Sequence, residues 1–281
     1  MPVRAPVAVP FYSGDIRAQM EIYEREFTPS SDLPEVISGG IVPHAGWYYS
    51  GRTASRVYLS IRHRRSPRTF VLFGAVHVPG VHSFAVYPDG SWQTPLGEAE
   101  VDRSLAEMFL EEIPDLLVPD TRAHAREHSI EVQLPMIKYL FPDARIVPIA
   151  APPLEEAVKL GGRIGRLIAG MDVAVIGSSD LTHYGDDYGF APAGYGEDAR
   201  AWMRSNDMKI IGAALDMQAE RIIPEAEADW NSCGAGAMAA TVAAAKSVGA
   251  GKGVLLEYTS SFDVRPEEEF RMAVGYAGII F

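Results

Sequence analysis

The apolar positions of this chain follow two spacings, one typical of buried strands and one typical of amphipathic helices. Continuous apolar runs at residues 69–75 and 172–177 indicate strands that are covered on both faces. At residues 53–62 apolar residues recur every three or four positions, which predicts a helix that packs through one face. The same pattern predicts further strands at 36–42, 145–150, 254–258 and 272–280, and further helices at 101–112, 129–140, 154–169 and 235–248.

This alternation of buried strands and helices predicts an α/β fold with a central, largely parallel or mixed sheet flanked by helices. Proline and glycine are spread along the chain instead of marking a boundary, so we expect one domain over residues 1–281. Ligands of such sheets bind beyond the carboxyl ends of the strands. Functional residues are therefore expected directly after the predicted strands.

Histidines follow two of the predicted strands. His44 comes straight after the strand at 36–42, and His77 follows the buried run at 69–75. Either ring could simply bond to loop backbone, but their shared position favours a common ligand. The aromatic residues Trp47 and Tyr48 come soon after His44, and we expect them to bind substrate.

A third strand end carries Asp180 and His183, three residues apart and close enough to meet within one turn. A carboxylate beside a histidine orients the ring and raises its basicity, so this pair predicts a catalytic acid or base. The alternative is that Asp180 caps a helix and His183 lies on the surface.

The only cysteine, Cys233, stands just before the alanine-rich helix predicted at 235–248. A helix N-terminus favours the thiolate form, although a lone cysteine is most often a small buried apolar residue. If Cys233 meets His44 and His77, the two imidazoles and the thiolate would form a metal site. Thiolate is a soft ligand, which suits Fe, Cu(I) or Zn.

A histidine-rich segment at 122–131 offers a competing metal site. His124 and His128 are four residues apart and would share one face of a helix, with Glu131 as a third ligand. Ser129 is a plausible helix start, however, and would leave His124 in a loop. We therefore expect His128 and Glu131 to line the pocket and bind substrate.

Charge and cysteine content narrow the class of protein. The formal net charge of −12 repels phosphate backbones and anionic lipid, so no nucleic-acid or membrane partner is expected. A single cysteine cannot form an intrachain disulfide, and residues 1–10 lack the pattern of a signal peptide. No apolar run approaches the roughly 20 residues that span a bilayer. These features predict a cytoplasmic protein.

Four motifs together resemble the Memo family, whose bacterial and archaeal members are called AmmeMemoRadiSam system protein B. The motifs are Pro-His-Ala-Gly-Trp at 43–47, Glu-His-Ser-Ile-Glu-Val-Gln-Leu-Pro at 127–135, Ser-Ser-Asp-Leu-Thr-His-Tyr-Gly at 178–185 and Cys-Gly at 233–234. That family is similar in fold to the class III extradiol ring-cleaving dioxygenases, the LigB-like group. Two local departures are Ala75, where the family usually has proline, and Ala235-Gly236, where polar residues are common.

The resemblance implies a role for each candidate residue. His44 and His77 would be metal ligands, and Cys233 would stand where the dioxygenases place a carboxylate ligand. His183 would match the catalytic histidine, with Asp180 beside it, and His128 would line the same pocket. The implied metal is Fe(II), with Cu or Zn as alternatives.

The resemblance also implies a function and partners. We expect a metal-dependent oxidoreductase of the dioxygenase type that acts on a small molecule, with an aromatic compound as the first choice. The pathway partners would be a radical-SAM enzyme and an Ammecr1-like protein. One alternative is a non-catalytic adaptor that binds a phosphopeptide or another anion in the same pocket. Another is hydrolysis by a zinc-bound water, which would use the same ligands.

Overall fold

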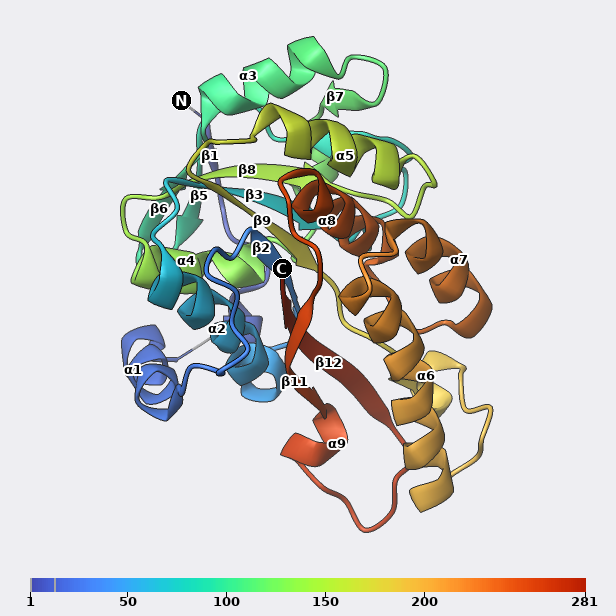
Figure 1. The fold of residues 1–281 in the computed structure, drawn as a ribbon. Helices are drawn as coiled ribbons and strands as arrows, with labels where there is room; N and C mark the ends of the chain where they lie inside the picture. Colours follow the sequence, from blue (N-terminus) through green and yellow to red (C-terminus); the bar gives the residue numbers. More distant parts are fainter. Residues whose placement is uncertain (1, 13) are drawn as a thin grey trace.

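The computed structural model describes residues 2–12 and 14–281 of the 281-residue chain. Its centre is a 9-stranded sheet, which is surrounded by helices (Figure 1). The strands lie in the order β10 (His183–Tyr184), β12 (Ala273–Ile280), β2 (Gly39–Val42), β9 (Val173–Ser178), β3 (Thr69–Gly74), β8 (Arg145–Ala150), β4 (Phe84–Val86) and β7 (Leu117–Pro119). Strand β11 (Val254–Ser260) pairs with β12 beside this path.

The middle of the sheet is parallel and its flanks are mixed. Strands β2, β9, β3 and β8 pair in parallel, whereas β12 runs antiparallel to β2 and β4 runs antiparallel to β8. All residues of β2, β3 and β9 are buried, which explains why their sequences are apolar apart from Thr69 and Ser178 at two strand ends. The predicted α/β fold with a mixed sheet is confirmed.

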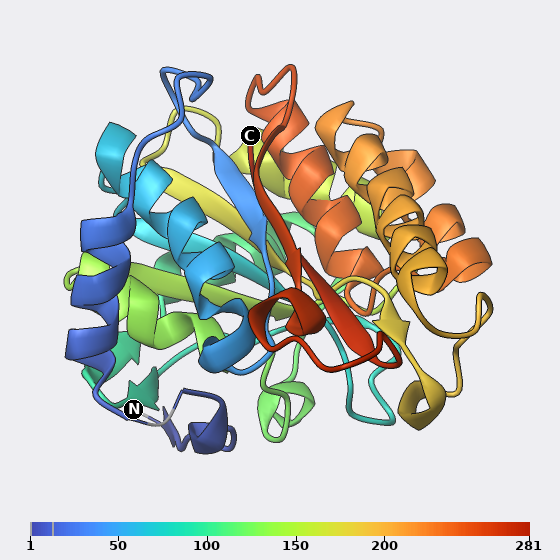
Figure 2. The same ribbon diagram turned by 90° about the horizontal axis from the view of Figure 1, so that it is seen from below.

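Helices cover both faces of the sheet (Figure 2). One face packs on α1 (Ile16–Glu26), α2 (Trp47–Arg64) and α4 (Leu134–Leu140). The other packs on α3 (Arg103–Glu112), α5 (Ala157–Leu167), α6 (Glu197–Leu215), α7 (Ala219–Asp229) and α8 (Ala235–Ser247). The alanines of α8 serve close packing: a Cβ at Gly161 of α5 would lie only 2.0 Å from the carbonyl oxygen of Ala240.

Short elements complete the described chain. A 3-stranded sheet joins β1 (Val3–Arg4), β5 (Ser91–Thr94) and β6 (Gly97–Glu100). The remaining helical elements are η1 (Val9–Tyr12), η2 (Arg122–His124), η3 (Glu131–Gln133), η4 (Asp186–Tyr188) and α9 (Ser261–Val264). Among the described residues, no helix is both long enough and apolar enough to cross a membrane.

The predicted helix at 129–140 is the clearest difference from the sequence pattern. The chain forms the 3-10 turn η3 first, and the α-helix α4 begins only at Leu134. Pro135 lies in the first turn of α4, where backbone N–H groups have no partner within the helix. Proline, which lacks this N–H, therefore costs no helical hydrogen bond there. The periodicity also missed α6, because this helix has polar residues on its buried face, Asn206 and Asp207 among them.

Candidate metal centre

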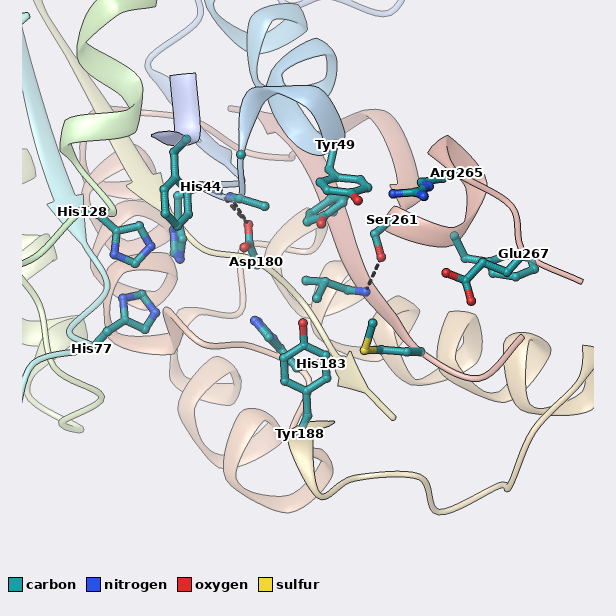
Figure 3. Close-up of a pocket in the computed structure, with 17 residues that line it drawn as sticks. His44, Tyr49, His77, His128, Asp180, His183, Tyr188, Ser261, Arg265 and Glu267 are labelled. Atoms are coloured by element: carbon teal, nitrogen blue, oxygen red, sulfur yellow. Dashed lines mark hydrogen bonds between the residues drawn. The ribbon is translucent and has the colours of Figure 1, made fainter. Parts of the chain in front are cut away.

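Loops from the carboxyl edge of the parallel strands meet at one place. His44 follows β2, His77 follows β3 and Asp180 follows β9, whereas Cys233 comes just before α8. The side chains of His44, His77, His128, Asp180 and His183 gather around one cavity (Figure 3). The placement follows from the topology, because β2, β9 and β3 are parallel neighbours and end at the same edge.

The structure brings His44, His77 and Cys233 together. One possible ligand atom from each lies within 4.8 Å of the others, and Nε2 of His44 is 3.3 Å from Sγ of Cys233. The His44 and His77 rings meet edge to face, with centroids 5.1 Å apart. Two imidazoles and one sulfur at this spacing can close around a single metal ion.

A hydrogen-bond chain sets the tautomer of His44. Nδ1 of His44 lies 2.9 Å from Oγ of Ser178, and this hydroxyl donates its proton to the carbonyl oxygen of Ser129 at 2.8 Å. Nδ1 of His44 must therefore carry the proton and donate to Ser178. Nε2 keeps its lone pair and points at Cys233, as a metal ligand requires.

Glu127 holds the second histidine in the same way. Its carboxylate accepts hydrogen bonds from Nδ1 of His77 at 3.1 Å and from the His77 backbone N–H at 2.6 Å. The backbone N–H groups of His128 and Ser129 donate to it as well. Burial works against charge on Glu127, but these bonds and His77 lower its pKa. Burial likewise opposes the charged form of His77, but Glu127 raises the pKa of that ring.

Cys233 is a neutral thiol in the absence of metal. Burial raises the pKa of the thiol, and the nearby charge of Asp180 raises it further. This is opposite to the lowering expected from the helix N-terminus, because burial is the largest influence on the pKa of this thiol. Burial also lowers the pKa of His44, with His77 and His128 adding to the effect. A metal that binds here must displace the thiol proton.

Asp180 supports His44 instead of pairing with His183. Its Oδ1 accepts hydrogen bonds from the backbone N–H of His44 at 2.7 Å and of Ala45 at 3.3 Å. Nδ1 of His183 lies 3.0 Å from the carbonyl oxygen of Leu181, so the ring donates its Nδ1 proton there and leaves Nε2 free. The prediction that Asp180 orients the ring of His183 is therefore wrong. Asp180 holds the backbone of His44, and the carbonyl oxygen of Leu181 orients the ring of His183.

The cavity beside these residues has a volume of about 430 Å³, and five of its lining residues are Phe or Tyr. Phe11 packs on His128 with ring centroids 4.8 Å apart, and Tyr188 packs on His183 at 5.0 Å. The other aromatic lining residues are Tyr49, Phe262 and Tyr276. Cys233 borders a neighbouring cavity of about 480 Å³, which it shares with His183, Tyr188 and Trp230.

Four residues from the sequence analysis lie elsewhere. Trp47 is buried and donates its indole N–H to the carbonyl oxygen of Val132, and Tyr48 is 67% exposed outside the cavity lining. Glu131 is buried against the N-terminal segment, where it pairs with Arg4 at 2.7 Å. His124 packs against Trp92 with centroids 5.6 Å apart. The structure places Trp47, Tyr48 and Glu131 outside the cavity lining in which we expected them, and His124 takes no part in the competing metal site, which we had ranked second.

Sequence reasoning missed several residues of the site. Glu127 stands next to His128 in the motif at 127–135, and its acidic side chain was the available signal. Tyr49 follows Tyr48, but consecutive residues lie about 100° apart around a helix, and only Tyr49 faces the cavity. No local pattern pointed to Phe11, which reaches the cavity from the far N-terminus.

Comparison with known proteins agrees with these motifs. The profile of the Memo-like protein family matches residues 4–280. A MEMO1 family protein of Pyrococcus furiosus is 38% identical, covering 99% of this chain and 98% of the relative. Another, from Thermococcus onnurineus, is 39% identical and covers 99% of each chain.

A solved structure shares the fold. The crystal structure of an uncharacterized protein from Escherichia coli K12 superposes with a TM-score of 0.53 at 12% identity. The match covers 79% of this chain and 91% of that one, and at this identity it concerns the fold alone. By the profile and the archaeal relatives, this chain belongs to the Memo-like protein family.

Proposed function

We propose that this protein is a metal-dependent oxidoreductase of the dioxygenase type, with Fe(II) held by His44, His77 and Cys233. Cu and Zn are the next metals that these donors would accept. The observation that carries the proposal is the donor set, whose ligand atoms lie within 4.8 Å of one another. In each histidine the other ring nitrogen is engaged, by Ser178 or by Glu127, which is the outer-shell arrangement of metal-binding histidines.

The bound metal would supply Lewis acidity and redox chemistry, with open positions for a substrate. His183 lies in the cavity wall with Nε2 free, because its Nδ1 proton is held by the carbonyl oxygen of Leu181. From this position it would take a proton from a hydroxyl group of the substrate and return it later. Asp180 holds the loop of His44, and Glu127 holds His77.

The cavity favours a small aromatic substrate. Its volume of about 430 Å³ suits a compound of one or two rings, and its wall carries Phe11, Tyr49, Tyr188, Phe262 and Tyr276. Such side chains provide flat apolar contact and ring stacking. A cytoplasmic location, and partners of the radical-SAM and Ammecr1-like types, stay predictions that depend on the family resemblance.

Arg265 favours a second candidate function, the binding of an anionic ligand without catalysis. It is the one arginine or lysine among the described residues that line the cavity. Asp180 and Glu267 line the same cavity, and their carboxylates would repel a phosphate. This candidate therefore ranks second to metal-dependent chemistry.

Metal analysis tests the proposal. The protein should be produced and purified without oxygen, with Fe, Cu and Zn supplied, and its metal content measured. We expect about one Fe per chain, lost in His44→Ala and kept in the control His82→Ala, whose ring is exposed. A folded wild-type protein that takes up none of the three metals would overturn the proposal.

Oxygen consumption with catechol-type compounds tests the chemistry. We expect His183→Ala to keep its metal and lose turnover, because His183 is placed in the cavity wall outside the donor set. An anionic peptide that binds equally well after the metal is chelated would favour the second candidate instead.

A further inference from the structure

Helix α6 carries two adjacent buried polar residues that the proposed chemistry does not use, and both contact the loops that lead to His183 and Cys233. Asn206 is 1% exposed and Asp207 is 0% exposed. A buried carboxylate and a buried amide are costly unless their hydrogen bonds are made, so their contacts are informative.

Asp207 holds the residue that precedes His183. Its Oδ1 accepts hydrogen bonds from the backbone N–H of Thr182 at 2.9 Å and from the Thr182 hydroxyl at 2.5 Å. Its Oδ2 accepts from the hydroxyl of Tyr258 at 2.8 Å. A Cβ at Gly275 would lie 2.2 Å from Oδ2, so glycine at this position of β12 admits the carboxylate.

Asn206 connects the same threonine to the loop of Cys233. Its side-chain amide donates to the hydroxyl of Thr182 at 3.1 Å and to the carbonyl oxygen of Asp229 at 2.8 Å. Its backbone carbonyl accepts from the amide of Asn231 at 3.0 Å, and Asn231 is fully buried two residues before Cys233. One turn of α6 therefore binds both loops.

Among the described residues, the direct hydrogen bonds between the two loops end at Ser179 and Asp180. The backbone N–H of Cys233 donates to the carbonyl oxygen of Asp180 at 3.2 Å, which fixes Asp180 but not the residues after it. The ring of His183 bonds to the carbonyl oxygen of Leu181, and Asp207 holds Thr182, which lies between these two residues. Strand β12 holds the same stretch from its other side, through Gly275 and through the pairing of β10 with β12.

We propose that Asn206 and Asp207 are positioning residues that set the spacing between His183 and Cys233. The inference rests on the proposed function, in which His183 is the acid–base group and Cys233 is a metal ligand. The distance between them then matters for the reaction. Neither residue is among those that line the cavity or form the donor set. Both act through Thr182 and Asn231.

The test uses the full chain loaded with Co(II), whose thiolate charge-transfer absorption reports on Cys233. Nitrogen NMR of labelled histidine in the metal-free protein reports the tautomer of His183, with His183→Ala for assignment. We compare Asp207→Ala, Asp207→Asn and Thr182→Val. Asp102→Ala is the control, because this buried carboxylate also accepts from a hydroxyl, that of Thr69, at the opposite end of β3.

We expect Asp207→Ala to weaken Co(II) binding roughly 10-fold, as loss of an outer support does, and to mix the two tautomers of His183. Asp207→Asn should stay within about twofold of wild type, because its amide can occupy the Oδ2 position and donate to Tyr258. Burial raises the pKa of Asp207 to about 7, so a neutral group is already tolerated there. Thr182→Val should also weaken Co(II) binding and mix the two tautomers of His183, as Asp207→Ala does.

Three results would overturn the inference. One is a folded Asp207→Ala variant with wild-type Co(II) affinity and a single His183 tautomer. Another is weaker Co(II) binding and mixed His183 tautomers in the control Asp102→Ala, which would show that these changes follow from a general loss of stability. If Asp207→Ala does not fold, an unchanged His183 tautomer in Thr182→Val contradicts the proposal. Wild-type protein that fails to bind Co(II) would contradict the proposed function instead, and the tautomer would still test the positioning.

Discussion

Nε2 of His44 lies 3.3 Å from Sγ of Cys233, although the two residues are 189 positions apart in the sequence. Burial keeps both groups neutral in the metal-free protein, because it lowers the pKa of the imidazole and raises that of the thiol. The pair is thus held ready for a metal, and only one proton has to leave on binding.

Replacing the sulfur tests this pair. We expect Cys233→Ser to lose more metal affinity than the roughly 10–100-fold that follows loss of an outer-shell partner. Serine keeps the size but is a poor ligand for a soft metal. Competition with a chelator measures the affinity, and Ser232→Ala serves as the neighbouring control. Unchanged metal affinity in Cys233→Ser would remove Cys233 from the site.

Glu127 should contribute to metal affinity, although it is not one of the three proposed ligands. Glu127→Gln keeps the shape but removes the charge that orients His77, so metal affinity should fall roughly 10–100-fold. The pKa of His77 should fall as well, because Glu127 raises it in the wild type. Histidine NMR titration measures this pKa. A wild-type value in the variant would contradict the assigned hydrogen bond.

Asp207 predicts a pH dependence of stability with a definite sign. Its pKa rises from 3.8 to about 7 on folding, so between these values the folded chain binds one more proton than the unfolded chain. The free energy of unfolding therefore falls as pH rises through this window, by about 1.4 kcal/mol per pH unit at most, and levels off above it.

Asp207→Asn removes this titration. Urea unfolding of metal-free protein between pH 5 and 8 should show a flatter profile for the variant, and the difference between the two proteins isolates Asp207 from other groups. Parallel profiles would mean that Asp207 titrates normally.

The ion pair of Arg4 and Glu131 anchors the N-terminal segment. The two side chains are 2.7 Å apart and only 5% and 1% exposed, and Glu131 also accepts from the hydroxyl of Tyr12. Glu131→Ala should lower the free energy of unfolding by about 3–5 kcal/mol, because it leaves a buried arginine charge unpaired.

The exposed pair of Arg52 and Glu26 provides the control for this substitution. Its side chains are 56% and 52% exposed, and Glu26→Gln should cost about 0–1 kcal/mol. Urea unfolding measures both variants. A loss below about 1 kcal/mol in Glu131→Ala would show that the N-terminal segment is held by other contacts.

The sequence by itself determined the α/β fold and the places where three of the site residues stand. Residues 70–74 of β3 and 173–177 of β9 carry no polar side chain because both faces of these strands are covered, and this pattern is local. His44, His77 and Asp180 could be placed at strand ends, because parallel strands bring their carboxyl ends to one edge whatever the rest of the chain does.

Only the tertiary structure decided which partner each polar group takes. Asp180 bonds to the backbone of His44 and not to His183, three residues away, and Glu131 turns from the pocket to Arg4. A hydrogen bond depends on atoms within about 3 Å of each other. Residues more than 100 positions apart reach that distance through packing, which the spacing of apolar residues along the chain does not encode.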